Sequence, residues 1–243
     1  MAEIKVDNFT KDYGNGRGAF NVGFAVNKGE VFGFLGPNGA GKSTTIRHLM
    51  GFSYPTSGKT FIKNIDSSKH ADKIMASVGY LPGELPLPEN MTGVGFIKYQ
   101  EGLRGRKNRS YTNKLLKMFD LNPYIKIKKM SFGTKRKLAI VTAFMFDPDV
   151  VLLDEPTGGL DPIMQHRFLK LLEQKKKEGK TILLSTHVFS EAEAICDRIG
   201  IIKDGSLVAL VDRNDVPNQR FDFDKHFLKY YEEEEGKHEY RTI

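Results

Sequence analysis

The chain has 243 residues, which suffices for one large α/β domain with a sizeable core but not for two full-sized independent domains. Its composition, 40% hydrophobic and 28% charged, is ordinary for a globular protein, and its most apolar uncharged run, residues 138–146, is too short to span a membrane. The formal net charge of +7 would suit nucleic acid or an anionic membrane, but we expect the basic clusters at 104–109, 126–129 and 175–177 to face water.

Strands and turns are predicted for the opening third of the chain. Residues 4–9 roughly alternate polar and apolar side chains, glycines at 14–18 mark a turn, and residues 30–35 form a short apolar strand. Apolar residues then recur at helical spacing over 46–50, and Gly51 is placed to end that helix.

The middle of the chain, residues 85–146, has helical spacing of its apolar side chains instead. After it, strands at 150–153, 181–185 and 199–202 alternate with helices at 162–179 and near Glu191, which indicates a parallel sheet. We therefore divide the chain into an α/β core (1–84 and 149–213), an inserted helical subdomain (85–148) and a tail (214–243) that contains a short helix at 227–231.

The clearest motif lies between the strand at 30–35 and the helix that follows it. Residues 36–43 read GPNGAGKS, which satisfies the phosphate-loop pattern G-x-x-x-x-G-K-[ST] in the expected strand-to-helix context. Glycines let backbone N–H groups converge on phosphate oxygens at the positive end of the helix dipole. Lys42 would reach the β and γ phosphates, and the Ser43 hydroxyl would bind Mg²⁺. The predicted nucleotide-binding residues here are Gly36, Pro37, Asn38, Gly39, Ala40, Gly41, Lys42, Ser43 and Thr44.

Two adjacent acids end the predicted strand at 150–153. Asp154 would hold the Mg²⁺ shell as a metal ligand, and Glu155 would orient or deprotonate the attacking water, with Lys42 as a further catalytic residue. Alone, such a pair of acids more often caps a helix. Because a phosphate loop occurs in the same chain, we interpret this pair as part of a nucleotide-hydrolysing site.

The run that follows identifies a family resemblance. Residues 153–157 (LDEPT) and 159–162 (GLDP) resemble the Walker B and D-loop segments of ABC ATPases, and the resemblance extends over most of residues 1–212. It implies that Asp161 lies in the D-loop beside the nucleotide and that His187 is the switch histidine near the γ phosphate. It also implies that Tyr13 stacks on the adenine. The implied fold is that of an α/β P-loop NTPase with a mixed, mainly parallel core sheet, antiparallel N-terminal strands and an inserted helical subdomain.

Two motifs depart from the family pattern. The signature L-S-G-G-Q corresponds to MSFGT at 130–134, and the resemblance implies that Ser131 and Gly133 contact the γ phosphate of ATP held by the opposite protomer. Phe132 places a side chain where close backbone approach is expected. Gly83 and then Glu84 occupy the region where the family usually has a glutamine that senses the metal. A regulatory or low-activity ABC subunit is therefore an alternative.

The resemblance implies ATP and Mg²⁺ as ligands, ATP-driven formation of a homodimer or heterodimer, and a separate transmembrane permease subunit. The permease would dock in a groove formed by the helical subdomain and the loop after Pro82, with Phe96 and Tyr99 either as contacts or in the core. The short single-motor chain and its tail resemble subunits of bacterial exporters of drugs, peptides or polysaccharides.

The location and the rival functions follow from simpler observations. Because Glu3 and Lys5 are charged, residues 1–6 lack the apolar core of a signal peptide, and we expect no export. The single cysteine, Cys196, is expected to pack in the core, and such sparse use of cysteine is typical of a reducing compartment. We expect a cytoplasmic protein, peripheral on the inner face of the membrane. A soluble ABC ATPase acting on ribosomes or DNA is the main alternative, but we expect no nucleic acid because aromatic and basic residues do not interleave. A small-molecule P-loop kinase would leave residues 131–133 and 159–162 unexplained.

Overall fold

A computed structural model of the protein describes residues 1–213, and the tail with its predicted helix at 227–231 lies outside the described residues. The first part of the fold is an antiparallel sheet of strand order β2-β1-β4-β5. It consists of β1 (Ala2–Asp12), β2 (Gly18–Asn27), β4 (Ser57–Ile62) and β5 (Ile65–Asp66). The predicted antiparallel N-terminal strands are therefore confirmed, although β1 extends beyond the predicted residues 4–9.

The second sheet has the strand order β10-β9-β3-β8-β7-β6. Its strands are β3 (Val31–Leu35), β6 (Gly79–Leu81), β7 (Val150–Asp154), β8 (Thr181–Thr186), β9 (Arg198–Lys203) and β10 (Ser206–Asp212). All neighbouring pairs are parallel except β9 and β10. Because parallel strands end at the same edge, Leu35 lies opposite Thr186, and Asp154 lies opposite Ser185. The chain segments that leave β3, β7 and β8 therefore meet in one place.

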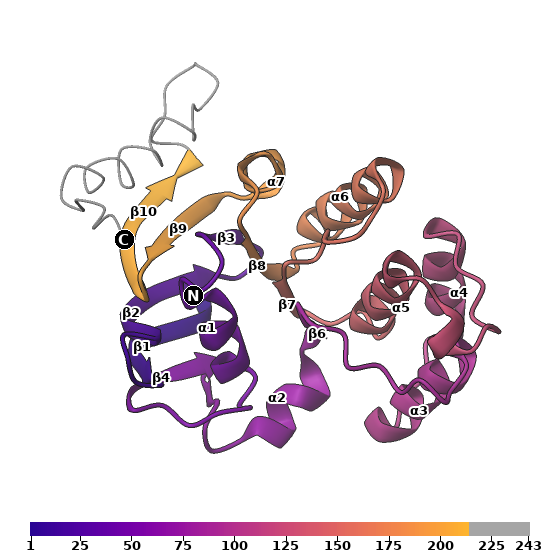
Figure 1. Cartoon of the computed structure of the whole chain (residues 1–243), viewed down its shortest axis with the longest axis horizontal. Helices are drawn as coiled ribbons and strands as arrows, with labels where there is room; N and C mark the ends of the chain where they lie inside the picture. The colour runs from indigo at the N-terminus through magenta and orange to yellow at the C-terminus, as the bar shows by residue number, and fades with distance from the viewer. Residues whose placement is uncertain (214–243) are drawn as a thin grey trace, which may run out of the picture.

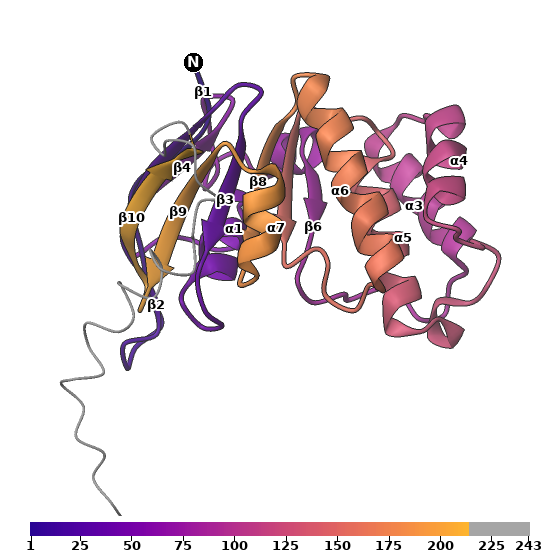
Figure 2. The same cartoon turned by 90° about the horizontal axis from the view of Figure 1, so that it is seen from above.

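Helices cover the six-stranded sheet and extend beyond it (Figure 1). They are α1 (Lys42–Leu49), α2 (Ala71–Ser77), α3 (Gly93–Arg104), α4 (Arg109–Met118), the short 3₁₀ helix η1 (Ile127–Lys129), α5 (Phe132–Phe144), α6 (Pro162–Lys177) and α7 (Phe189–Ile195). Both views place α3, α4 and α5 together at the end of the molecule far from β1, β2 and β10 (Figures 1 and 2). Within residues 1–213, none of the helices is both long and apolar enough to cross a membrane.

The central strands are buried on both faces, which explains their continuous apolar sequences. Every residue of β3, β7 and β8 is buried. Val151 and Leu153 pack with the helices α3 to α7, whereas Val150 and Leu152 pack with α1 and the antiparallel sheet. This alternation follows from the period of two along a strand. The two cores on opposite faces of β7 hold its carboxyl end in a fixed place.

Three details differ from the sequence-based predictions. Strand β10 was not predicted, because its residues alternate between partly buried and exposed positions along the edge of the sheet. Lys175, expected to face water, is buried against Asp147 and Glu178, because α6 turns that side chain inward. Phe96 is buried, but Tyr99 is 50% exposed, so core packing is wrong for Tyr99.

Candidate active site

Glycine is required at three points of the loop that joins β3 to α1. Gly39 and Gly41 have φ angles of 84° and 98°, which side-chain-bearing residues rarely adopt. A Cβ atom on Gly41 would also lie 2.6 Å from the carbonyl oxygen of Gly18. One on Gly36 would lie 2.3 Å from the carbonyl oxygen of Ile202. The loop is thus packed closely against the backbone of two neighbouring strands.

The amino end of α1 is arranged to receive an anion. Its N-cap is Gly41, which offers no side chain to the first N–H groups, and its first turn contains no acidic residue. The first N–H groups of a helix have no acceptor within the helix, and the helix dipole makes this end positive. The start of α1 therefore has the geometry of a phosphate site.

Lys42 is only 4% exposed, and its ammonium group is already surrounded by acceptors of the same chain. It donates to the carbonyl oxygens of Gly36 at 2.7 Å and Pro37 at 3.0 Å. Its Nζ also lies 3.1 Å from Oε1 of Glu155. A buried cation needs such partners, because burial without them is costly. The same ammonium group is in place to exchange some of these contacts for phosphate oxygens.

The two carboxylates at the end of β7 have different surroundings. Asp154 is buried, and its Oδ1 accepts a hydrogen bond from the Ser185 hydroxyl at 2.5 Å. Glu155 has a left-handed backbone with φ of 48°, and its N–H donates to the carbonyl oxygen of Ser185 at 3.1 Å. Its Oε2 shares a hydrogen bond with Nδ1 of His187 at 2.5 Å. Asp154 is thus fixed by β8, and Glu155 turns out of the strand between Lys42 and His187.

The carboxylates of Asp154 and Glu155 and the ring of His187 line one cavity of about 620 Å³. Five of the residues predicted from the sequence line it: Asn38, Ser43, Asp154, Glu155 and His187. Gly83 and Glu84, where the chain departs from the family pattern, line it as well. The lining also includes residues that the sequence reasoning missed, Arg47, Phe52, Tyr80, Pro82 and Pro86. No motif flagged them, because they come from α1, β6 and the loops beside these elements.

Tyr80 is the missed residue with the most altered chemistry. Burial, and secondarily the charge of Asp154, raises the pKa of the Tyr80 phenol to about 12. The phenol is therefore neutral at physiological pH and is unsuited to act as a base. Its ring makes an edge contact with Phe52, with 5.6 Å between ring centroids, and the two rings form an aromatic wall of the cavity.

Eleven predicted site residues do not line this cavity. Seven of them lie in the phosphate loop and at the start of α1, namely Gly36, Pro37, Gly39, Ala40, Gly41, Lys42 and Thr44, and the other four lie in other segments. Ser131 is the N-cap of α5 and accepts from the Thr134 N–H at 3.2 Å, and Asp161 is the N-cap of α6. Gly133 packs against the segment after β7, where a Cβ atom would lie 2.7 Å from the carbonyl oxygen of Gly159. Tyr13 lies in the turn between β1 and β2 and is 59% exposed. These four residues are presented away from the cavity of their own chain.

A comparison with known families decides the classification. Residues 19–158 of this chain match the ABC transporter family. The chain belongs to the ABC transporter family. Its family and its α/β P-loop fold, both predicted from the sequence, are thereby confirmed, and ATP hydrolysis is the enzyme activity of this class.

Similar proteins within the ABC transporter family include a relative and two solved structures. The chain is 34% identical to the probable multidrug ABC transporter ATP-binding protein YbhF of Escherichia coli over 221 residues, which is 89% of this chain and 38% of YbhF. A structure described as the ATP binding subunit of an ABC transporter has a TM-score of 0.85 and 30% identity, covering 94% of this chain and 99% of that one. The dimeric structure of the bacterial ABC transporter cassette MJ0796 has a TM-score of 0.78 and 27% identity, covering 86% and 98%. The chain therefore corresponds to a whole cassette but spans well under half of YbhF.

Proposed function

We propose that this chain is the ATP-binding and hydrolysing subunit of an ABC transporter and powers export through a separate transmembrane subunit by ATP-driven dimerisation. The observation that carries the proposal is the cavity in which the phosphate loop, Asp154, Glu155 and His187 meet. The export direction is supported by the multidrug designation of the relative YbhF.

The contacts of Glu155 suggest how binding and hydrolysis are connected. In this structure its two carboxylate oxygens contact Lys42 at 3.1 Å and His187 at 2.5 Å. When ATP phosphates attract the Lys42 ammonium group, Oε1 of Glu155 is released to accept a hydrogen bond from water. His187 holds the other oxygen and keeps the carboxylate directed into the cavity. Glu155 then orients the water or takes its proton.

The residues present fit a magnesium ion that accompanies the nucleotide. Among residues 1–213, no cluster of three or more His, Cys, Asp or Glu side chains forms a metal cage of its own. Mg²⁺ normally takes one or two protein oxygens together with phosphates and water. Ser43 and Asp154 line the same cavity and supply hydroxyl and carboxylate oxygens of that kind. The bound ion would neutralise charge that develops on the phosphates.

Dimerisation accounts for the predicted residues that lie away from the cavity. Ser131 is exposed and Gly133 is partly exposed at the amino end of α5, and Asp161 is exposed at the amino end of α6. We propose that these residues face the nucleotide of a second cassette, and the dimeric state of the similar cassette supports such a pairing of two cassettes. Tyr13 would then stack on the adenine of its own chain. ATP bound between two cassettes stabilises the closed dimer by linkage.

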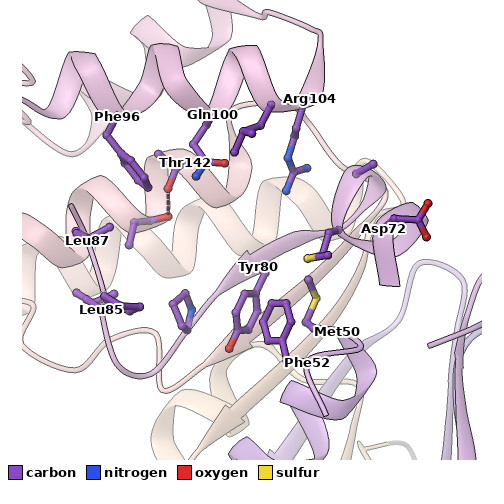
Figure 3. A pocket seen from close by; sticks show the side chains of 16 residues that line it. Met50, Phe52, Asp72, Tyr80, Leu85, Leu87, Phe96, Gln100, Arg104 and Thr142 are labelled. Carbon is purple, nitrogen blue, oxygen red and sulfur yellow. Dashed lines mark hydrogen bonds between the residues drawn. The ribbon is translucent and has the colours of Figure 1, made fainter. Parts of the chain in front are cut away.

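A groove between the helical subdomain, residues 85–148, and the sheet offers a place for the permease. It has a volume of about 410 Å³. Figure 3 shows Phe96, Gln100 and Arg104 of α3 across from Tyr80, Phe52 and Met50, with Leu85 and Leu87 beside them. Its lining is mostly apolar with few polar groups, as expected for a site that receives a helix of another protein. The chain would thereby be held at the inner face of the membrane.

Replacing Glu155 with glutamine tests the proposed hydrolysis. We expect Glu155→Gln to bind ATP with an affinity near that of the wild type, to lower kcat at least about 100-fold, and to accumulate as an ATP-bound dimer. The amide keeps the shape of the side chain but cannot take a proton. ATP binding is measured by equilibrium titration, turnover by phosphate release, and the dimer by light scattering.

The matched control is Glu89→Gln, which removes an exposed carboxylate paired with Lys135 at 3.2 Å and should leave all three quantities unchanged. A Glu155→Gln protein that hydrolyses ATP like the wild type would refute the role of the base. The transport assignment has its own test, in which tagged Glu155→Gln protein is purified with ATP from detergent-solubilised native cells. A co-purifying multi-span membrane protein supports the permease, whereas ribosomal or DNA-repair proteins alone contradict it.

A further inference from the structure

A buried arginine of α5 joins segments that are far apart in the sequence. Arg136 lies one turn after the start of α5 and is only 2% exposed. Its Nη1 donates to the carbonyl oxygen of Pro82 at 2.9 Å, and its Nη2 donates to that of Gly83 at 2.8 Å. Its Nε donates to the carbonyl oxygen of Gly158 at 3.1 Å. One planar guanidinium therefore connects three carbonyl groups of two different loops.

Both loops flank the carboxylates of the candidate active site. Gly83 packs directly on Asp154, since a Cβ atom at Gly83 would lie 3.1 Å from Oδ2 of Asp154. The N–H of Gly158 donates to the carbonyl oxygen of Glu155 at 3.4 Å. A shift of either loop therefore changes the surroundings of one of the two carboxylates. Arg136 contacts neither the phosphate loop nor the catalytic carboxylates through the hydrogen bonds that hold it.

The chemistry of the contact is specific to arginine. Three bonds in different directions match the fixed fork of a guanidinium, whereas an ammonium group has no such planar geometry. The guanidinium carbon also lies 5.3 Å from the ring centre of Phe132, whose ring is packed against Gly159. Burial lowers the pKa of Arg136, and the charges of Asp154 and Glu155 oppose that effect. The cost of burying this charge is offset by its hydrogen bonds, and these bonds fix the positions of three neutral carbonyl groups.

The same arginine lies next to the groove described above. Pro82 and Ala139 both line the groove, and Ala139 follows Arg136 by three residues on α5, which brings both to neighbouring positions on that helix. A partner seated in the groove would press on the two elements that the guanidinium holds together. Arg136 is thus placed between the groove on one side and Asp154 and Glu155 on the other.

We propose that Arg136 is a positioning residue for ATP hydrolysis, which fixes the loops beside Asp154 and Glu155 to α5. A displacement of α5 relative to the sheet is then transmitted through these bonds to the loops beside both carboxylates. This inference rests on the proposed ATPase function and adds the residue through which the helical subdomain controls it.

The test separates the rate of turnover from nucleotide binding. In Arg136→Met, we expect kcat to fall at least about tenfold, because misplacing catalytic groups by an ångström can slow turnover strongly. We expect the equilibrium affinity for ATP to change less than about threefold, because the phosphate loop makes no contact with Arg136 and stays intact. Steady-state phosphate release gives kcat, and titration with ATP in a hydrolysis-blocked Glu155→Gln background gives the affinity.

A control variant accounts for the general effect of losing a guanidinium that connects the core with the helical subdomain. Arg167 of α6 donates to the carbonyl oxygen of Met118 at 2.8 Å and so also connects the core with the helical subdomain, away from the carboxylates. Arg167→Met should lower the melting temperature but leave kcat within about twofold of the wild type. Arg136→Lys is the second variant, for use if Arg136→Met does not fold. It keeps the charge and loses the fork, and its kcat should still fall.

Hydrogen exchange supplies a readout that a loss of overall stability would not give. In Arg136→Lys, we expect faster exchange at the amides of residues 83–84 and 158–160, with unchanged exchange in β7 and α1. Unchanged kcat in both Arg136 variants, or equal losses in Arg136 and Arg167 variants, would overturn the inference. A wild-type chain that binds ATP but never hydrolyses it would instead overturn the proposed function.

Discussion

The phosphate loop (residues 36–43) and the Arg136 junction, in which Arg136 binds the carbonyl groups of two loops, lie near the same cavity. Different kinds of interaction fix the backbone in these two regions. The phosphate loop is one continuous segment whose shape follows from glycines that press against neighbouring backbone at Gly18 and Ile202. In the junction, the side chain of Arg136 binds three residues that lie 22, 53 and 54 positions away from it in the chain. Steric exclusion fixes the first region, and directional hydrogen bonds fix the second.

This difference assigns different roles to the two regions. The phosphate loop contacts β3, α1 and the neighbouring strands, so its geometry does not depend on where the α3 to α5 group lies (Figure 2). The junction depends on the position of α5, because Arg136 belongs to that helix. We therefore expect ATP affinity to be insensitive to movements of the helical subdomain and the rate of hydrolysis to be sensitive to them.

The largest effect that tests this comparison is expected in the phosphate loop. Gly41→Ala combines a left-handed backbone with a contact of 2.6 Å to a carbonyl oxygen, whereas Gly39→Ala has the left-handed backbone but open space. We expect ATP affinity to fall about 100-fold in Gly41→Ala and about fivefold in Gly39→Ala, since backbone strain alone is worth on the order of 1 kcal/mol. Calorimetric titration with ATP measures both. Equal losses in the two variants would show that backbone strain alone, without the steric contact, shapes the loop.

A smaller effect is expected at the bond between β7 and β8. Ser185→Ala removes the hydroxyl that donates to Oδ1 of Asp154 and leaves a buried carboxylate oxygen without that donor. We expect kcat to fall about tenfold and the Mg²⁺ concentration for half-maximal activity to rise, since a bond to a charged group is worth roughly 1.5–3 kcal/mol. The activity is measured against Mg²⁺ at saturating ATP. Ser77→Ala, which removes a hydroxyl bonded to the Lys73 carbonyl oxygen on α2, is the control. Loss of ATP affinity alone would contradict the role given to Asp154.

The smallest effect is a pH dependence of the free energy of unfolding, which we expect from His48 in α1 but not from Asp147 in the helical subdomain. Burial lowers the pKa of His48 in α1 below its ordinary 6.5, and its Nε2 has no hydrogen-bond partner among the described residues. The unfolded chain therefore binds the proton more readily, and the free energy of unfolding should decrease as pH falls below 6.5. In the helical subdomain, burial acts to raise the pKa of Asp147, but its bond with Lys175 leaves that pKa below 3.8. That pair keeps its charges over this range.

Urea denaturation at pH 7.5 and pH 5.5 measures this dependence. His48→Asn keeps a donor near the Ser53 carbonyl oxygen, which lies 2.7 Å from Nδ1 of His48, but cannot titrate. It also loses the stacking on Phe9, so the comparison concerns the change with pH rather than the absolute stability. We expect a weaker pH dependence in this variant. The same dependence in both proteins would place the titrating group elsewhere.

Residues close together in the sequence were the ones that could be predicted. The phosphate loop, the acids at the end of β7 and the helix that begins after Asp161 each lie within a few residues, and their spacing has a direct local meaning. Strand β10 escaped prediction because an edge strand with partly exposed residues has a weak apolar pattern. Tyr80 and Arg47 escaped because they reach the cavity from the ordinary surfaces of β6 and α1.

The sequence by itself determined the class of the protein and its order of strands and helices around the phosphate loop, and it predicted the residues that we propose to meet ATP. The physical reason is that glycine conformation, helix dipoles and apolar strand patterns act over short stretches of chain. Only the tertiary structure decided that Lys42 rests on Glu155, that Lys175 is buried, and that Arg136 is an internal connector although it lies in the basic run 135–137. Such outcomes depend on which distant backbone carbonyls and carboxylates meet a cation, and packing between separate elements sets those distances.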